Sequence, residues 1–198
     1  MYYHYRVWSR PGADGASALD KALEELVLSE RVMSGKQAKP SMTIVDSKSE
    51  KNAFTAEEKG YDGGKKISGI KIHLGVDILG LPNGIHVTAG NVTDRKGALE
   101  MLGKHAPKLR KILKVLCDGG YTGADFAEAV KALLNADVEI AKRRASHKFE
   151  VIPKRWVVER SLSWLDHFRR LWKNCERKLH TVHQMVSLAF ISILLRRC

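Results

Sequence analysis

The sequence predicts a mixed α/β fold, in which an antiparallel hairpin and parallel strands form one central sheet flanked by helices. Apolar and polar residues alternate from 70 to 78 and from 85 to 89, and the turn residues "GLPNG" lie between the two runs. This is the pattern of an antiparallel hairpin with half-buried strands. Strand-like and helix-like segments then alternate from residue 114 to 143, which is typical of parallel strands joined by a helix.

The remaining elements follow from the apolar spacing along the chain. Residues 17–33 carry leucine and valine at helical intervals, and "SGKQAKPS" at 34–41 has the composition of a linker. A short strand is expected at 42–46, and the polar stretch 47–66 is expected to be mobile. Further helices are expected to begin at Thr93 or Asp94, after the strand at 114–117, from about residue 154 to 174, and over the apolar segment 185–195.

The net charge of the chain indicates a polyanionic partner. The 198 residues include 34 Lys plus Arg and 22 Asp plus Glu, which gives a net charge of +12 and a pI near 9.7. The excess is concentrated between residues 141 and 178, where there are twelve basic and four acidic side chains. DNA or RNA is the natural partner of such a chain, although a solvated basic face would give the same count.

The composition disfavours several other classes of protein. The apolar segment 185–195 is well short of the roughly 20 residues that a membrane span needs. The N-terminus lacks the apolar segment of a secretion signal. Three cysteines without a CxxC pair argue against a disulfide framework or a cysteine zinc site. We therefore expect a cytoplasmic protein with no membrane partner.

Two aspartates mark the ends of short apolar strands. Asp46 ends "MTIVD" and Asp118 ends "KVLCD". If these strands are parallel neighbours, the two carboxylates lie side by side, and each raises the pKa of the other unless a cation lies between them. A divalent metal such as Mg²⁺ would supply that cation, and a pair of metals can bind both oxygens of an in-line phosphoryl displacement. Either aspartate taken alone would more often cap a turn.

A third carboxylate is expected from the helix that begins near residue 154. One side of this helix is apolar, and another side carries a polar stripe of two acids flanked by two cations: Arg155, Glu159, Asp166 and Arg170. The helical pattern does not choose between Glu159 and Asp166 as the third acid. An ordinary surface ion pair between Arg155 and Glu159 would explain the same spacing, and such pairs add little stability.

Several longer segments resemble one known family in sequence and in order. They are "IVDSKSEKN" at 44–52, "GYDGGKKISGIKIHLGVDILGLP" at 60–82, "VTAGNVTDRKGA" at 87–98, "LCDGGYTG" at 116–123 and "RWVVERSLSWLDHFRRLWKNCER" at 155–177. Together they resemble the DDE transposases of bacterial insertion sequences, specifically the insertion-sequence-five group. The resemblance runs from about residue 42 to the C-terminus.

The resemblance implies an RNase H-like fold with its first and fourth strands adjacent. It also implies that Asp46, Asp118 and Glu159 are the catalytic acids and hold two Mg²⁺ or Mn²⁺ ions. In the family, one metal activates a water or the freed 3′ hydroxyl, and the other stabilises the leaving 3′ oxygen.

The resemblance also bears on contacts with DNA. The family has an arginine four residues before the glutamate, which Arg155 matches, and a basic residue seven after it, where this chain has Asp166. Phosphate contacts are expected from the basic residues Arg155, Arg169, Arg170, Lys173, Lys65 and Lys71.

The resemblance further implies an organisation and a set of partners. Residues 1–40 are expected to be the tail of an N-terminal region plus a linker, and 41–198 the RNase H-like DDE catalytic domain. The chain would be a second-frame product or a remnant of a longer transposase. Its partners would be element ends and target DNA, joined by a homodimer in a synaptic complex at the nucleoid. Two alternatives are a DNA-binding inhibitor of the complete transposase and an RNase H-like nuclease.

Overall fold

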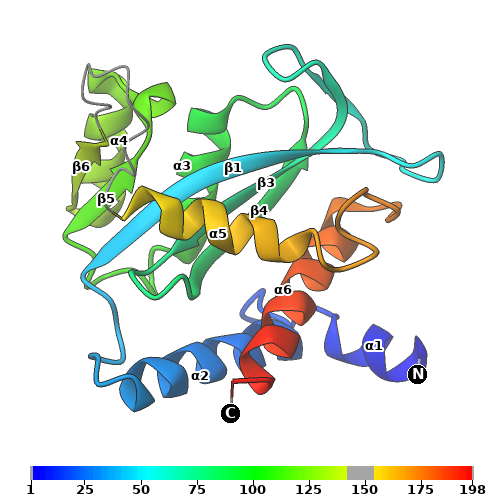
Figure 1. Cartoon of the computed structure of the whole chain (residues 1–198), viewed down its shortest axis with the longest axis horizontal. Helices are drawn as coiled ribbons and strands as arrows, with labels where there is room; N and C mark the ends of the chain where they lie inside the picture. The colour runs from blue at the N-terminus through cyan, green and yellow to red at the C-terminus, as the bar shows by residue number, and fades with distance from the viewer. Residues whose placement is uncertain (1, 142–153, 198) are drawn as a thin grey trace.

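The computed structural model describes residues 2–141 and 154–197, and one mixed sheet lies at the centre of this part of the chain (Figure 1). The strands run in the order β2-β3-β1-β5-β6, and β4 pairs with the remaining length of the β3 edge. The antiparallel pairs are β1–β3, β2–β3 and β3–β4, and the parallel pairs are β1–β5 and β5–β6. The strands are β1 (Met42–Lys51), β2 (Gly60–Asp62), β3 (Ile67–Val76), β4 (Pro82–Ala89), β5 (Lys114–Cys117) and β6 (Asp137–Ile140).

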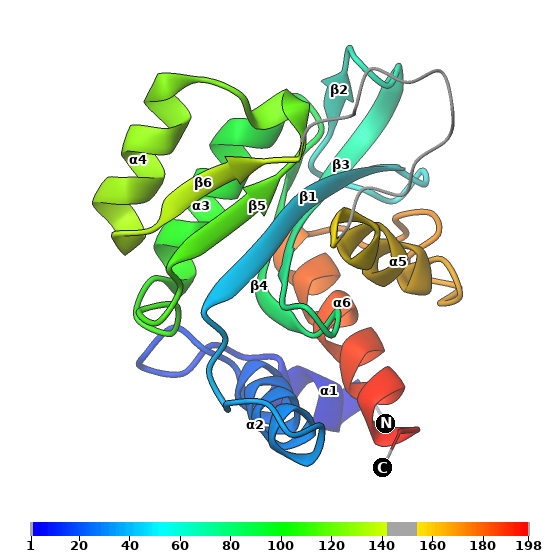
Figure 2. The same ribbon diagram turned by 60° about the vertical axis from the view of Figure 1, so that its left-hand side comes forward.

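Helices cover both faces of the sheet (Figure 2). Helices α3 (Asp94–His105) and α4 (Ala124–Leu134) pack on one face over a core that includes Val45 and Val115. Helices α5 (Arg155–Leu165) and α6 (Leu179–Leu195) pack on the other face over a core that includes Ile44 and Leu116. Because successive strand residues point to opposite faces, each short strand contributes to both cores. The predicted α/β class with a mixed sheet and flanking helices is confirmed.

The stretch 47–66, which was expected to be mobile, is partly strand, so that expectation was wrong. Strand β1 continues through Lys51, and residues 60–62 form β2. The polar side chains of this stretch find partners inside the sheet, because Ser49 Oγ donates to Asp62 Oδ2 at 2.6 Å and both residues are buried. A strand whose polar side chains are hydrogen-bonded inside the protein shows no alternation of apolar and polar residues, so the sequence pattern does not predict it.

Strand β3 is buried on both faces, whereas its alternation predicted a half-buried strand. His73 is fully buried under α3, where its Nε2 lies 2.9 Å from Thr88 Oγ1. The ring fits because α3 has Gly97 at the contact, where a Cβ would come within 2.1 Å of it. Thr93, one of the two expected caps, is the N-cap of α3, and its hydroxyl accepts from Lys96 N.

The helix expected from about 154 to 174 is shorter than predicted. Helix α5 ends at Leu165, and the chain then turns through irregular structure before α6 begins at Leu179. In this turn Asn174 is buried and forms an isolated parallel bridge with Asn52 at the end of β1. This tertiary pairing outweighs the helical spacing of the sequence. The expected strand at 137–143 is confirmed as β6 up to Ile140, and its last two residues lie outside the described part.

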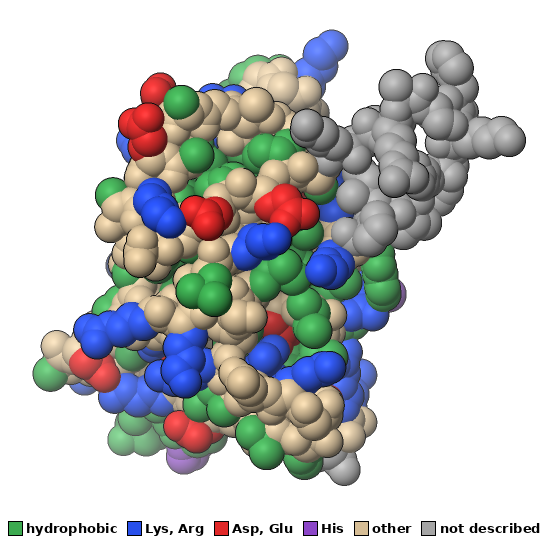
Figure 3. Space-filling model, turned by 90° about the vertical axis from the view of Figure 1, so that its left-hand side faces the viewer, with side chains coloured by type: hydrophobic (Ala, Val, Ile, Leu, Met, Phe, Trp, Pro, Cys, Tyr) green, Lys and Arg blue, Asp and Glu red, His purple; other side chains and the backbone are tan. Residues whose placement is uncertain are grey.

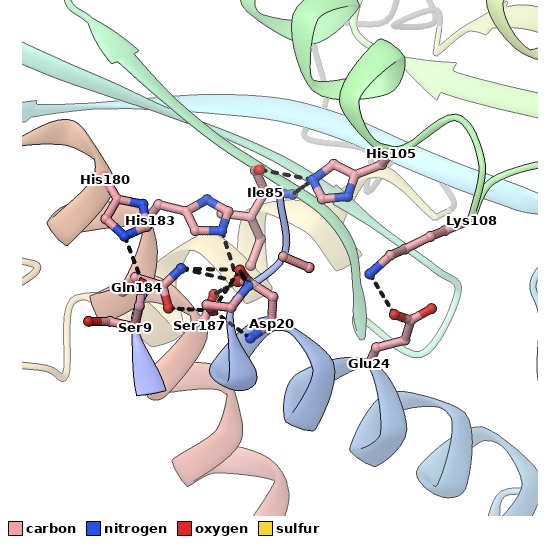
Figure 4. Close-up of polar contacts among 12 residues, drawn as sticks. Ser9, Asp20, Glu24, Ile85, His105, Lys108, His180, His183, Gln184 and Ser187 are labelled. Carbon is pink, nitrogen blue, oxygen red and sulfur yellow. Dashed lines mark hydrogen bonds and ion pairs between the residues drawn. The ribbon is translucent and has the colours of Figure 1, made fainter. Parts of the chain in front are cut away.

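Helices α1 (Tyr2–Trp8) and α2 (Ala18–Met33) precede the sheet, and α2 packs against α6. Leu23 and Val27 of α2 join the same apolar core as α6. Figure 4 shows the polar contacts at the start of α2, where Asp20 accepts hydrogen bonds from Ser17 and from three residues of α6. At its other end Arg31 forms a buried ion pair with Asp77, just after β3. Helix α2 is therefore an integral layer of the fold.

None of the helices in residues 2–141 and 154–197 combines the length and the apolar character needed to cross a membrane. Helix α6 is the most apolar of them, and it packs against the sheet and α2.

Candidate active site

Asp46 and Asp118 lie at corresponding positions on neighbouring parallel strands. In the β1–β5 pair, Ile44 is opposite Leu116, and each aspartate lies two residues further along the chain. Asp118 directly follows β5, as expected, whereas Asp46 lies inside β1 and does not end it, because the strand continues to Lys51. The period of two places both carboxylates on the face that carries α5. The resemblance to DDE transposases implied that these two strands are adjacent, and this register confirms it.

Asp118 also caps the turn that follows β5. Its Oδ1 accepts a hydrogen bond from Gly120 N at 2.9 Å, at the start of the short 3₁₀ helix η1 (Gly119–Tyr121). Arg95 of α3 holds the same turn, because its Nε donates to Gly120 O at 2.9 Å. One carboxylate oxygen thus fixes the loop, and Oδ2 lies 3.5 Å from Arg155 Nη2. Asp118 therefore both caps a turn and faces the α5 side of the sheet.

Arg155 connects Asp118 to Glu159. The same Nη2 atom lies 3.1 Å from Glu159 Oε1, one turn further along α5. Arg155 is half-buried, and its Nε is buried with no hydrogen-bond partner in the described residues. The Glu159 side chain is half exposed. The structure therefore brings Asp118, Arg155 and Glu159 together beside Asp46.

Asp166 occupies a different place on the same helix. It is the C-cap residue of α5, and its carboxylate pairs with the ammonium of Lys48 on β1. Lys48 Nζ also lies 2.7 Å from Glu50 Oε1. The pattern of alternate residues on β1 explains this contact, since Asp46, Lys48 and Glu50 share the face that α5 covers. Of the two acids that the helical pattern left open, Glu159 is the one linked to Asp118.

The electrostatics of Asp46 are unusual for a strand carboxylate. Burial, the largest cause, raises the pKa of Asp46, and the negative charge of Asp118 adds to this rise, so that the pKa is about 6. A hydrogen bond from Ser47 N at 2.7 Å and the charges of Arg155 and Lys65 oppose the shift without cancelling it. The Asp46 carboxylate is thus shielded from water, and its neighbours stabilise its negative charge only in part. An added cation would therefore be stabilising.

The three acids have the donor chemistry that Mg²⁺ and Mn²⁺ prefer. All three offer carboxylate oxygens, and these are hard ligands for hard cations. Within the described residues, no three His, Cys, Asp or Glu side chains are gathered closely enough to form a ready metal site. Instead, Arg155 is the cation between Asp118 and Glu159. The residues fit a metal by their chemistry and by the raised pKa of Asp46.

The six basic residues expected to contact DNA divide by their surroundings. Lys65 is exposed and its ammonium lies 3.3 Å from Ser47 O, close to Asp46. Arg169 and Lys173 are exposed in the turn after α5, where Arg170 is tied to Glu176. Lys71 differs, because its side chain is only 6% exposed and pairs with Asp62 and Asp94. In Figure 3, lysine and arginine side chains are spread over one whole face of the molecule.

The site includes two residues that sequence reasoning did not select. Arg95 holds the Asp118 turn, and Lys48 joins β1 to the end of α5. Lys48 could have been found from its position two residues after Asp46, on the same face of a strand. The sequence offered no comparable signal for Arg95.

A mixed sheet of this topology with helices on both faces is consistent with the RNase H-like fold of DDE enzymes. The family model described as "Transposase DDE domain" matches residues 37–195, and the chain belongs to this family. It is also 35% identical over 119 residues to a protein of Burkholderia cepacia described as a putative transposase for insertion sequence element IS402. The match covers 56% of this chain and 55% of the relative, so the chain spans about half the length of that curated relative.

Proposed function

We propose that this transposase domain cuts the ends of an insertion sequence and joins them to target DNA in a reaction that depends on two Mg²⁺ or Mn²⁺ ions. The observation that carries the proposal is the Asp118–Arg155–Glu159 linkage beside Asp46, at corresponding positions of two neighbouring parallel strands. Three hard-oxygen ligands with a desolvated member suit phosphoryl transfer better than any other chemistry of DNA. Membership of the insertion-sequence-five group is part of the proposal.

Each acid has a proposed role in holding the metals and the scissile phosphate. Asp46, Asp118 and Glu159 would hold the ions, which lower the pKa of a bound water and stabilise charge on the leaving 3′ oxygen. Arg155 is placed to turn from the carboxylates to a phosphate oxygen when the acids gain another cation. Arg95 keeps Asp118 in place through the Gly120 carbonyl.

The DNA is proposed to run over the basic surface around α5. Lys65 lies beside Asp46, and Arg169, Arg170 and Lys173 extend the surface beyond the end of α5. Lys71 is left out of the proposed contacts, because its ammonium is buried between two carboxylates. Two element ends must be held together for joining, so we propose a homodimer as the working form, bound to DNA in the nucleoid.

The organisation of the chain is also part of the proposal. We keep residues 41–198 as the catalytic domain and 1–40 as a preceding segment, with one addition from the packing. Since α2 shares the core of α6, it would stabilise the catalytic domain directly.

The test is cleavage and joining of DNA that carries the element ends, with Mn²⁺ or Mg²⁺ and then with a chelator. Nicking is expected only with metal and is expected to fall at least about 1,000-fold in Asp118→Asn and in Glu159→Gln, as for groups that act as one catalytic unit. Asp166→Asn is the matched control on the same helix and should retain activity. Full activity of Asp118→Asn would overturn the proposal. Cutting without joining would indicate a nuclease, and binding without cutting an inhibitor.

A further inference from the structure

Two loops at the far end of β1 and α5 are joined into one rigid surface. Residues 52–59 follow β1 and residues 172–178 follow α5, and we call them together the two-loop platform. Ala53 N donates to Asn174 O at 2.7 Å, and Asn174 N donates to Lys51 O at 2.9 Å. Thr55 Oγ1 donates to Cys175 O at 2.9 Å. In Figure 1 the two loops lie side by side beyond the ends of β1 and α5.

The platform presents two large aromatic side chains to solvent. Phe54 is fully exposed and Trp172 is 60% exposed, one on each loop. Exposing an aromatic ring forgoes the stabilisation that its burial would give. The backbone on both loops is fixed by hydrogen bonds, so the two rings are held outward by ordered structure. Two exposed aromatic rings on loops that hydrogen bonds join are suited to a partner with flat groups.

Cations surround these rings. Exposed basic residues on or next to the platform are Lys51, Lys59, Arg169, Lys173, Arg177 and Lys178. Two of the three carboxylates on the loops are already neutralised, because Glu57 pairs with Arg177 and the buried Glu176 pairs with Arg170. The net charge of the side chains around the two rings is therefore positive. A partner that carries negative charge and flat apolar groups would match this surface best. Nucleic acid combines those two properties.

The platform also lies on a direct line from the proposed catalytic acids. Asn52 directly follows β1 and lies six positions after Asp46, which at about 3.3 Å per position is roughly 20 Å. A DNA strand covers that distance in about six nucleotides at about 3.4 Å each. Lys48 lies on the same face of β1 between the two places.

We propose that the two-loop platform binds unpaired nucleobases of the DNA by stacking on Phe54 and Trp172, about six nucleotides from the phosphodiester at the acids. This inference rests on the proposed function, because it needs DNA at Asp46 and Asp118. The surrounding lysines and arginines hold the phosphates, and the rings hold the bases without regard to sequence.

The experiment measures DNA binding in a chelator, so that catalysis does not enter. The probes are a single-stranded oligonucleotide and a duplex with an unpaired segment. Phe54→Leu and Trp172→Leu are each expected to weaken binding about 5- to 100-fold, as for loss of one stacked base, with an unchanged salt slope. Trp172→Phe keeps an aromatic face and is expected to retain most of the affinity.

The control is Leu113→Ala, which changes an exposed apolar residue just before β5. Equal affinity of both leucine variants and the wild type would overturn the inference, as would an equal loss in Leu113→Ala. Loss of self-association with DNA affinity intact would show that the rings bind a second copy, which also overturns it. Failure of the proposed function has a different signature, since wild-type protein would then not bind DNA or not cut it.

Discussion

Asp20 and Asp46 are both half-buried aspartates, and their surroundings differ sharply. Asp20, at the start of α2, accepts hydrogen bonds from Ser17, His183, Gln184 and Ser187. Burial raises its pKa, but the bond to His183 and the other donors outweigh this, and the net shift is downward. Asp46 has one backbone donor, and burial raises its pKa to about 6. The hydrogen-bond donors around Asp20 fully stabilise its negative charge, whereas the neighbours of Asp46 do not.

Asp20 is a structural acid, whereas Asp46 is the acid that we propose to be reserved for a metal ion. A carboxylate that joins helices is stable when every lone pair has a donor. A carboxylate that must bind a cation has to be left incompletely satisfied, at a cost to the free energy of unfolding. In Figure 4 the polar residues around Asp20 lie at the contact between α2 and α6.

The largest expected effect on stability comes from removing the charge of Asp20. Asp20→Asn removes the carboxylate that accepts hydrogen bonds from His183 and Ser17. We expect the free energy of unfolding to fall by about 3 kcal/mol, or the melting temperature to fall by roughly 6–12 °C. Thermal unfolding monitored by circular dichroism measures it. Asp14→Asn is the control, because this exposed carboxylate pairs only with Lys21 and should shift stability little. Equal shifts in both variants would remove the contrast between the two aspartates.

Asp46→Asn is expected to act in the opposite direction. Removing an under-compensated charge should raise the free energy of unfolding by about 1–2 kcal/mol at pH 7.5, after allowance for its partial exposure, while activity is lost. Chemical denaturation at fixed pH measures the change. A destabilised Asp46→Asn variant would show that the carboxylate is satisfied in the fold, contrary to our account.

The difference in stability between the wild type and Asp46→Asn should depend on pH, because the pKa of Asp46 is raised. Between pH 4 and 6 the folded protein holds a proton on Asp46 that the unfolded chain releases, so the contribution of Asp46 to stability falls as pH rises. The stability advantage of Asp46→Asn should therefore grow from pH 4 to about 6.5 and then level off. Denaturation of both proteins across this range is the measurement. A constant difference would mean that the pKa of Asp46 is not raised.

The smallest expected effect is that of Asp166→Asn. Its carboxylate is 46% exposed, and its pair with Lys48 should contribute less than about 1 kcal/mol. Thermal unfolding should show a shift within about 3 °C. A shift as large as that of Asp20→Asn would show that the link between β1 and α5 is a major source of stability.

The apolar runs that stop at Asp46 and Asp118 predicted neighbouring carboxylates only on the condition that the two strands are parallel neighbours. The resemblance to DDE transposases implied that adjacency, and the pairing of β1 with β5 confirms it. Glu159 and Asp166 lie seven residues apart on one helix, so periodicity alone could not separate them. The two acids differ in their contacts with other residues. Glu159 pairs with Arg155, which also contacts Asp118, whereas Asp166 pairs with Lys48.

Other features could not be predicted because polar groups were satisfied by distant partners. The alternating pattern of residues 70–78 predicts that Lys71 is exposed, yet its side chain is buried between Asp62 and Asp94. The early end of α5 depends on the pairing of Asn174 with Asn52, 122 residues away in sequence. The pairing of Ser49 with Asp62 has the same character, and it extends β1 through a polar run.

The most direct test of the central claim is Mn²⁺ binding, followed by electron paramagnetic resonance of the free ion. The account predicts that wild-type protein with bound DNA takes up Mn²⁺ and that Asp46→Asn and Asp118→Asn each lose most of this binding. Asp20→Asn, measured at a temperature where it is folded, should bind as the wild type does. Wild-type Mn²⁺ binding in Asp46→Asn and Asp118→Asn would contradict the claim that these carboxylates are reserved for a metal.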